Sequence, residues 1–314
     1  MVPLRLSNIM IAGTGGVCCA RWSPGKENPR LPLETGGGDL AVSSSIQLRV
    51  ASVIRAVGFV VLFLLTHASL LLLFPFNLSR FLLFVAWYGA GTLVILYLLF
   101  HPRCQWLVTN RSKVECNGRR CVSLTFDDGP SPLHTPELLE ILRKSNVQAT
   151  FFVIGKEAER FPDLLHRVAA DGHLIANHTY SHPLLFCFLA PWRLRREIEK
   201  GQEAIEKIWG RRPRYFRSPV GLRHPLLDLY LEQAKLEYIS WTIRSFDTLV
   251  PQPEVILKRI LKRVAPGDII LLHDNASAGA GLMLNVLPRL INELKGRGFE
   301  FVPVGALQPA AVPA

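Results

Sequence analysis

The sequence has few cysteines and few charged residues for its length, and neither glycine nor proline is enriched. Six cysteines scattered over 314 residues are too few for a small scaffold held together by disulfides. The 23 glycines and 22 prolines are close to average usage, which excludes fibrous repeats. With 49% hydrophobic and only 19% charged residues, the chain is too apolar to be intrinsically disordered. Its length allows about two ordinary domains.

The net charge of +11 is unevenly distributed along the chain. Residues 1–116 contain 10 Lys and Arg against 4 Asp and Glu, whereas residues 117–314 contain 26 against 21. The basic excess is therefore densest in the apolar N-terminal third, which favours a membrane surface as its partner. The sequence contains no recognisable nucleic-acid-binding motif, so we expect no nucleic-acid partner.

Two long runs without a charged residue, 56–79 and 81–102, explain the excess hydrophobicity. About 20 helical residues cross a ~30 Å hydrocarbon core, so each run is long enough to span a membrane. We predict a transmembrane hairpin over residues 51–103, with spans at about 56–75 and 81–100. The alternative for each run is a helix buried in a soluble core. The first run begins too far from the start of the chain for a cleavable signal peptide.

Basic residues near the predicted hairpin suggest its orientation. Within about 20 residues of the two apolar runs, two basic residues precede them (Arg49 and Arg55), five follow them, and the turn contains only Arg80. The positive-inside rule therefore places both ends, and with them the C-terminal domain, on the cytoplasmic side of the membrane. Residues 1–50 show no apolar periodicity and are expected to form a flexible tail, and residues 104–116 to form a linker.

Over residues 117–304, short apolar strands alternate with charged amphipathic helices. The expected strands are Cys121–Phe126, Ala149–Val153, His173–Ala176, Tyr215–Arg217, Tyr238–Thr242, Asp268–His273 and Phe299–Val302. The expected helices include Thr135–Ser145, Glu157–Asp171, Trp192–Trp209 and Glu254–Val264. This alternation predicts a parallel α/β domain, and seven strands without a dinucleotide-binding glycine motif favour a barrel. Functional residues of such barrels lie at the carboxyl ends of the strands. Residues 305–314 are expected to form a C-terminal tail.

Polar residues occur at the ends of several of these strands. Asp127 and Asp128 are adjacent carboxylates before a Gly-Pro break, although a solvated turn would explain them equally well. His178 and His182 are four residues apart, which places two imidazoles on one face of a helical turn and suits a shared metal ion. A single histidine is more often structural.

Three further signals follow along the chain. Arg217 ends a strand just before a proline and a glycine, where an arginine is usually a surface charge. Asp247 follows Trp241, and a buried apolar strand ends in His273 and Asp274. Each signal has a structural explanation by itself. Because all five occur in order at strand ends, together they indicate one catalytic site.

The segments TFDDGP, HTYSH and LLHD resemble the polysaccharide deacetylase family, the NodB-homology carbohydrate esterases, over about residues 117–304. RSPVG and SFDT resemble its motifs more loosely. The resemblance implies a distorted (β/α) barrel that uses a metal ion to remove an acetyl or other small acyl group from an amino sugar. It implies that Asp128, His178 and His182 bind the metal. Asp127 would be the base and His273 the acid.

The resemblance also implies that Arg217 orients Asp127, that Asp247 tunes His273, and that Leu271 lines the pocket for the acyl methyl group. Two neutral imidazoles and one carboxylate leave coordination positions for water and a carbonyl, as catalytic zinc sites require. Zinc is therefore the expected ion, although the ligand set also admits other divalent ions. The backbone N–H of Val220 is the expected donor to the oxyanion.

The sequence departs from the family pattern at two places. The family commonly has an aromatic residue where Val220 stands and a tryptophan soon after the aspartate matching Asp247, where this chain continues Thr248-Leu249-Val250. Both changes remove aromatic surface for stacking sugar rings, which argues against a long polymer groove. Two alternatives stay open: a two-His-one-carboxylate iron oxygenase, and a catalytically inactive, membrane-anchored sugar-binding or scaffold protein.

Residues 183–192, directly after His182, are almost wholly apolar and are followed by Arg193, Arg195 and Arg196. This loop either folds back over the barrel or enters a membrane interface where the arginines meet phosphates. The second alternative, together with the predicted hairpin, indicates a lipid-linked amino sugar as substrate.

Cys116 and Cys121 flank four residues, and a hairpin loop there would place them opposite each other. A disulfide between them would suit an oxidising compartment. That outcome would conflict with the cytoplasmic placement that the charge count predicts.

Overall fold

In a computed structural model of the chain, residues 54, 58, 61–69, 78–101, 104–274 and 280–305 are described. The strands are β1 (Asn110–Arg111), β2 (Cys121–Asp127), β3 (Thr150–Val153), β4 (Leu174–Asn177), β5 (Tyr215–Phe216), β6 (Glu237–Ile239), β7 (Ile243–Arg244), β8 (Ile269–His273) and β9 (Glu300–Phe301). The α-helices are α2 (Leu78–Phe100), α3 (Thr135–Lys144), α4 (Gly155–Arg160), α5 (Pro162–Ala170), α6 (Pro191–Trp209), α7 (Leu227–Gln233), α8 (Pro253–Arg263) and α9 (Ala280–Gly296). Two 3₁₀ turns lie at Phe186–Phe188 and Pro219–Gly221.

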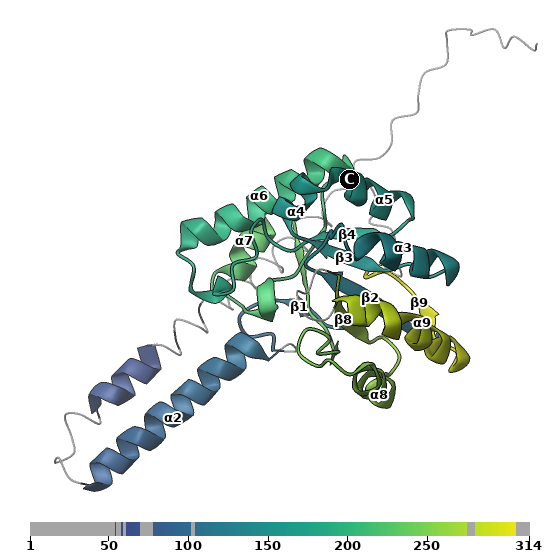
Figure 1. The fold of residues 1–314 in the computed structure, drawn as a ribbon. Helices are drawn as coiled ribbons and strands as arrows, with labels where there is room; N and C mark the ends of the chain where they lie inside the picture. The colour runs from purple at the N-terminus through teal and green to yellow at the C-terminus, as the bar shows by residue number, and fades with distance from the viewer. Residues whose placement is uncertain are drawn as a thin grey trace, which may run out of the picture. The chain divides into compact units, whose positions relative to one another are not determined.

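The strands form one sheet in the order β1-β6-β5-β4-β3-β2-β8-β7, with β9 pairing beside β2, and every pairing between these strands is parallel. The short connection between β6 and β7 shows that this sheet is curled. Strands β6 and β7 are six strand spacings apart, about 29 Å in a flat sheet at ~4.8 Å per spacing. The four-residue step from Ile239 to Ile243 reaches at most about 14 Å. The sheet must therefore bend into the expected distorted (β/α) barrel (Figure 1).

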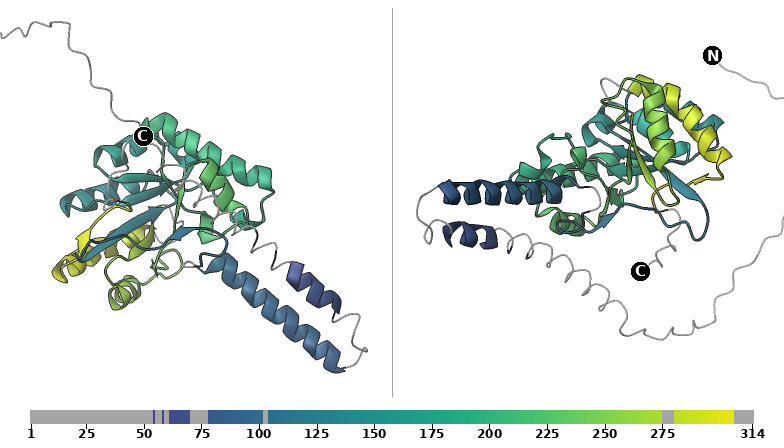
Figure 2. Two further views of the ribbon diagram at one scale, coloured as in Figure 1. Left: turned by 180° about the vertical axis from the view of Figure 1, so that it is seen from behind. Right: turned by 90° about the horizontal axis from the view of Figure 1, so that it is seen from below.

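The alternation of side chains along the strands separates an inner from an outer face. On β8, Ile270 and Leu272 belong to the core beneath the helices, whereas Ile269 and Leu271 belong to a second core inside the barrel. The outer core is completed by apolar faces of α3, α5, α8 and α9, which lie outside the strands (Figures 1 and 2). Since successive residues of a strand point to opposite faces, His273 points inward with Leu271.

Two expected elements differ from the observed ones. The helix expected over 157–171 is divided into α4 and α5 at Phe161, because Pro162 has no N–H to continue the hydrogen-bond ladder of α4 and instead begins α5. The strand expected over 238–242 is divided into β6 and β7. Between β6 and β7 the chain crosses the open side of the curled sheet.

Of the two predicted membrane spans, the second forms the continuous helix α2, which is long and apolar enough over Phe81–Phe100 to cross a membrane. The first is described only at residues 54, 58 and 61–69, which are helical. Phe63 stacks on Trp87 with ring centroids 5.6 Å apart, and His67 contacts Phe84. Residues 75–77 of the predicted hairpin turn lie outside the described residues, whereas residues 78–80, which were expected in that turn, form the beginning of α2.

The C-terminal end of α2 is packed against the barrel domain. Leu98 is buried in a cluster that also contains Phe186 and Phe216. The buried side chain of Arg223 donates a hydrogen bond of 2.6 Å to the carbonyl oxygen of His101, just beyond the helix. A cation at this position complements the unpaired carbonyls and the negative end of the helix dipole.

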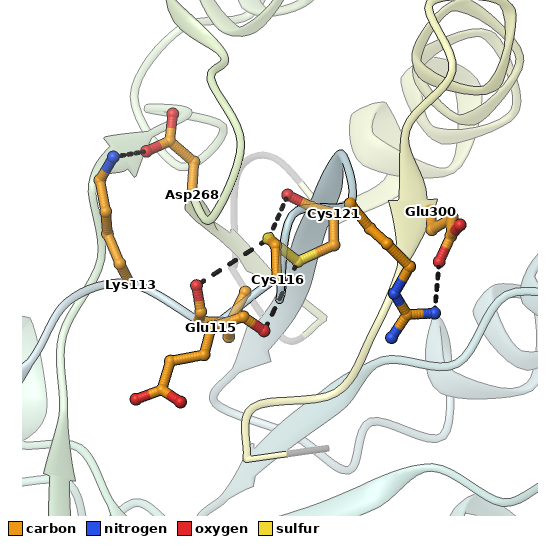
Figure 3. The surroundings of a disulfide bond; sticks show 8 residues. Lys113, Glu115, Cys116, Cys121, Asp268 and Glu300 are labelled. Carbon is orange, nitrogen blue, oxygen red and sulfur yellow. Dashed lines mark hydrogen bonds and ion pairs between the residues drawn. A yellow bond between two sulfur atoms is a disulfide. The ribbon is translucent and has the colours of Figure 1, made fainter. Parts of the chain in front are cut away.

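Residues 104–116, expected to be a linker, are in contact with the barrel. Leu107 and Val108 are buried, and β1 pairs with β6. A two-residue strand carries no periodic pattern, so the sequence does not reveal it. Cys116 and Cys121 form a disulfide where β2 begins, beside an ion pair between Lys113 and Asp268 (Figure 3). The disulfide lies at the opposite end of β2 from Asp127.

Candidate active site

The polar residues selected from the sequence gather at the carboxyl ends of the parallel strands. Asp127 ends β2, and it is in register with His273 at the end of β8. His178 directly follows β4, and Arg217 directly follows β5. Parallel strands bring residues that are far apart in sequence to one edge of the sheet.

Asp128, His178 and His182 bring three ligand atoms within 4.8 Å of one another. Asp128 Oδ1 lies 3.3 Å from His178 Nε2 and 3.2 Å from His182 Nε2. Ligand atoms about 2.1 Å from a tetrahedral zinc ion are separated from each other by about 3.4 Å. The donor set and its spacing therefore fit a divalent metal ion.

Hydrogen bonding and burial prepare the histidines for this role. His178 Nδ1 lies 2.8 Å from the carbonyl oxygen of Arg217, and because a carbonyl can only accept, Nδ1 carries the proton and Nε2 keeps its lone pair. Burial, assisted by the neighbouring His178, lowers the pKa of His182 and favours the neutral form that binds metal. Burial alone would raise the pKa of Asp128, but when the histidines are protonated the hydrogen bond and charge of His178, with the charges of His182 and His273, lower it to about 2.

The segment carrying both histidines is a loop and not the helical turn suggested by their spacing. Thr179 and His182 have positive φ angles, and α6 supports the loop from behind. Glu197 of α6 accepts hydrogen bonds from the N–H and hydroxyl of Ser181. Gly201 lets α6 approach closely, since an added Cβ would lie 2.8 Å from the Thr179 backbone. The histidines converge because of this support.

Asp127 is held by a buried arginine. Arg217 has no exposed surface and donates from Nη1 to Asp127 Oδ1 at 2.7 Å. Its other hydrogen bonds go to Thr125 Oγ1 and to the carbonyl oxygens of residues 239 and 240, and its guanidinium stacks 3.9 Å above the Phe152 ring. Burial lowers the pKa of Arg217, an effect that Asp127 opposes. The arginine thus fixes the orientation of the carboxylate.

His273 is paired with Asp247 at 2.8 Å between Nδ1 and Oδ1. The second oxygen of Asp247 accepts the backbone N–H of His273, and Ser245 donates to the first. Burial alone would lower the pKa of His273, but the hydrogen bond and charge of Asp247 outweigh it and raise this pKa to about 9. The imidazole is therefore protonated at neutral pH and can donate a proton.

These groups surround a cavity of roughly 150 Å³. Its lining consists of Asp127, Asp128, His178, His182, Val220, Gly221, Trp241, Arg244, Thr248, Leu271 and His273. The cavity is smaller than the ~300 Å³ typical of sites that enclose a whole ligand, so it suits a small substituent such as an acetamido group. Arg217 and Asp247 lie behind Asp127 and His273.

Val220 and Leu271, which the sequence predicts to contact the substrate, both line the cavity. Leu271 is buried at the base of the cavity, and Val220 is 42% exposed at its rim. Val220 has a φ of 57°, and its backbone N–H donates to no acceptor within the described chain. Gly221 must lack a side chain, because an added Cβ would lie 2.3 Å from the Trp241 ring.

Positive φ angles concentrate around this cavity. Of eight non-glycine residues with positive φ in the described chain, five belong to its walls or supporting loops: Asp128, Thr179, His182, Val220 and Phe246. Such conformations cost about 1–3 kcal/mol each and persist only where the surroundings enforce them. This clustering is typical of a functional site.

Asp274, Trp241 and Arg244 also lie in or beside the site, although their sequence contexts predict no role for them. Asp274 is fully buried, and burial raises its pKa to about 7. It accepts a hydrogen bond from Thr135 and lies so close to Gly129 that any side chain there would collide with it. Asp274 therefore supports the turn that carries Asp128. Trp241 and Arg244 line the cavity, a placement that depends on how the sheet curls.

Comparison with known proteins agrees with this geometry. A family model described as polysaccharide deacetylase matches residues 114–239. A peptidoglycan-N-acetylglucosamine deacetylase of Bacillus cereus is 33% identical over 204 residues, which cover 64% of this chain and 91% of that protein. A chitooligosaccharide deacetylase of Bradyrhizobium sp. is 34% identical over 209 residues, which cover 63% of this chain and 94% of that protein.

Solved structures show the same fold. A peptidoglycan N-acetylglucosamine deacetylase in complex with an N-hydroxybenzamide derivative matches with a TM-score of 0.58 and 33% identity, over 62% of this chain and 90% of that one. A CE4 family pseudoenzyme from Bacillus anthracis matches with a TM-score of 0.57 and 26% identity, over 62% of this chain and 67% of that one. The fold is therefore shared by active and inactive proteins.

Proposed function

The chain belongs to the polysaccharide deacetylase family, and we propose that it is a metal-dependent hydrolase that removes an acetyl or other small acyl group from an amino sugar. The observation that carries this proposal is the arrangement around one cavity. Three metal-ligating atoms, a buried carboxylate and a protonated histidine all face the same small space. Amide hydrolysis needs these three functions within reach of one carbonyl group.

In this proposal Asp128, His178 and His182 hold a divalent ion, for which zinc is the expected choice. When bound, such an ion supplies Lewis acidity to the acyl carbonyl and lowers the pKa of a water molecule. The nitrogen and oxygen donors also suit other divalent ions. An iron oxygenase with the same ligand types normally uses an antiparallel jelly roll, whereas these residues lie on a parallel barrel.

The remaining residues carry the protons and position the groups. Asp127, held by Arg217, takes a proton from the attacking water. His273, kept protonated by Asp247, gives a proton to the leaving amine. In the same proposal the N–H of Val220 donates to the oxyanion that develops at the carbonyl, and Leu271 contacts the acyl methyl group. Their place in the cavity lining supports these roles.

For the substrate we propose an acetylated amino sugar, with a lipid-linked glycan as the specific case. In the loop after His182, Phe186 is buried in the core, whereas Leu184, Leu185, Phe188 and Trp192 are each about two-thirds or more exposed. Exposed apolar groups of this kind mark interaction surfaces. The packing of Leu189 in the same cluster as Leu98 of α2 supports a membrane as the partner.

Basic residues at the start of α6 support the same proposal. Arg193 and Arg196 line a hollow that also contains Trp192 and Lys200, and neither arginine forms an ion pair with a residue that the structure describes. Arg195, in contrast, is paired with Glu199 at 2.7 Å. Phosphates at the membrane surface or on a lipid-linked sugar are therefore proposed partners of Arg193 and Arg196.

We further propose that α2 anchors the protein in a membrane as part of the hairpin over residues 51–103. Because β1 pairs with β6 in the sheet, the folded catalytic unit would extend from about residue 104 to residue 304. Residues 1–50 and 305–314 would be tails at the two ends of the chain. The charge count favours a cytoplasmic barrel. The disulfide between Cys116 and Cys121 favours an oxidising compartment. We propose the oxidising side, because the disulfide is a specific feature of the fold whereas the charge count is a statistical tendency.

The competing proposal is an inactive sugar-binding or scaffold protein, which the Bacillus anthracis pseudoenzyme makes a specific alternative. Acetate release from acetylated chitooligosaccharide and from peptidoglycan, measured with the purified full-length protein in detergent, separates the two. A hydrolase releases acetate, stops when the metal is chelated, and recovers when zinc is restored. An inactive protein binds the sugar and releases no acetate under either condition.

A further inference from the structure

Arg244 is a cation inside the proposed catalytic cavity. It ends β7, where it is in register with Leu271 of β8, so both side chains face the inside of the barrel. Its guanidinium lies 6.0 Å from the Trp241 ring centroid and 5.1 Å from that of Phe246. Together with the proposed metal ligands, Arg244 lines the cavity.

Among the described residues, no carboxylate forms an ion pair with this cation, although the charges of Asp247 and Asp127 act on it from a distance. Within the described chain, its guanidinium forms no ion pair and no hydrogen bond, and only its carbonyl oxygen is used, by Arg259. The nearby carboxylates are engaged elsewhere, since Asp127 is bonded to Arg217 and Asp247 to His273. Burial lowers the pKa of Arg244, but an arginine stays charged at any physiological pH. Keeping an unpaired cation partly buried is costly unless a ligand compensates it.

A charge count shows a positive excess to which Arg244 contributes. Asp127, Asp128 and Asp247 contribute three negative charges around the cavity. Arg217, protonated His273 and a divalent metal ion would contribute four positive charges, with His178 and His182 neutral. Arg244 raises the excess to two positive charges. A negatively charged group on the substrate would compensate part of this excess.

We propose that Arg244 binds an oxyanion, a phosphate or carboxylate, carried by the amino sugar close to the acylated nitrogen, and so selects acidic over neutral substrates. This inference rests on the proposed function, because it places the sugar at the metal site. A planar guanidinium with several N–H donors suits both phosphate and carboxylate oxygens. The aromatic faces of Trp241 and Phe246 hold the guanidinium in place.

The test measures binding, so it does not depend on turnover. The full-length protein carrying Asp127→Asn, loaded with zinc in detergent, is titrated calorimetrically with three sugars: neutral N-acetylglucosamine, its 1-phosphate, and N-acetylmuramic acid. We expect one of the two acidic sugars to bind at least about tenfold more tightly than the neutral one, since a hydrogen bond to a charged group contributes about 1.5–3 kcal/mol. The acidic sugar that binds more tightly identifies the source of the oxyanion.

Three further variants decide whether Arg244 is responsible. Arg244→Gln should abolish the preference, and Arg244→Lys should retain part of it. The matched control is Arg259→Gln. Arg259 also stacks on the Phe246 ring, 4.2 Å from its centroid, but it does not line the cavity. This variant should keep the full preference.

A preference that survives Arg244→Gln, or equal affinity for all three sugars, would overturn the inference. If Arg244→Gln does not fold, the other two variants still decide the question. If Arg259→Gln loses the preference while Arg244→Lys keeps it, then net charge and not Arg244 is responsible. Absence of acetate release by the unmodified protein, with the preference present, would instead reject the proposed hydrolase and leave the anion site intact.

Discussion

Asp127 and Arg217 form an ion pair with 2.7 Å between carboxylate and guanidinium, and both side chains are almost fully buried. Charges are buried in this way only when they are paired and hydrogen-bonded. Arg217 also provides the carbonyl oxygen that orients His178. One residue therefore connects the proposed base to a proposed metal ligand.

Replacing this arginine tests the connection. Arg217→Lys keeps the charge but loses the forked geometry, so we expect kcat to fall about 10–100-fold, the range seen when residues supporting a metal site are changed. The melting temperature should also fall, because a lysine leaves some of the buried partners without hydrogen bonds. Steady-state kinetics and thermal unfolding measure the two effects. Unchanged kcat in a folded variant would contradict the orienting role.

The pair of His273 and Asp247 predicts a pH dependence. Because the pKa of His273 is raised to about 9, kcat/KM should decline as pH rises through that value and the acid loses its proton. Asp247→Asn removes the charge that raises this pKa and should move the decline to lower pH. Ser245→Ala removes only a hydrogen bond to Asp247 and serves as the control, with a smaller shift.

The raised pKa of His273 also makes the free energy of unfolding depend on pH. A histidine whose pKa is raised by folding stabilises the protein fully below its unfolded pKa of about 6.5, and that contribution is lost as pH rises towards 9. The difference in free energy of unfolding between the unmodified protein and Asp247→Asn should therefore shrink between pH 6.5 and 9. A difference that grows over this range would contradict the assignment.

The exposed loop after His182 predicts a substrate-dependent defect. Leu184→Ser with Phe188→Ser should lower turnover of a lipid-linked acetylated sugar several-fold, because both side chains are exposed and apolar. Turnover of a short soluble acetylated sugar should be spared. Phe186 is unsuitable for this test because it is buried in the core. The control is Val255→Ser, an exposed apolar position on α8. Equal loss on both substrates would show that the loop only supports the fold.

The disulfide predicts the accessibility of two cysteines. With the other four cysteines replaced, Cys116 and Cys121 should react with a membrane-impermeant thiol reagent in intact cells only after reduction with an impermeant reductant. That result supports the proposed oxidising side. Labelling only after lysis, without any reductant, would support the cytoplasmic side that the charge count predicts.

Much of the fold follows from local sequence patterns. The buried strands β2 and β8 are mostly apolar and end in polar residues, and the sequence predicts both to within one residue. The residues of the cavity could be selected because their chemistry is unusual at strand ends. The two-residue β1 and the division of 157–171 at Phe161 carry weaker local signals, and the structure alone reveals them.

The parts that the sequence did not reveal depend on contacts between distant segments. Arg244 lies in the cavity because it is in register with Leu271, 27 residues further along the chain. The two histidines converge through a loop supported by Glu197 and Gly201, although their spacing suggested a helical turn. Neither arrangement can be read from a local pattern.

In the proposed hydrolase, Asp128, His178 and His182 hold the metal while Asp127 acts as the base. The most direct measurement compares metal content, by elemental analysis, with acetate release for the unmodified protein, Asp127→Asn and the double variant His178→Ala, His182→Ala. We predict one metal ion and turnover in the first, one metal ion without turnover in the second, and neither in the third. Stoichiometric metal retained in the double variant would contradict the claim.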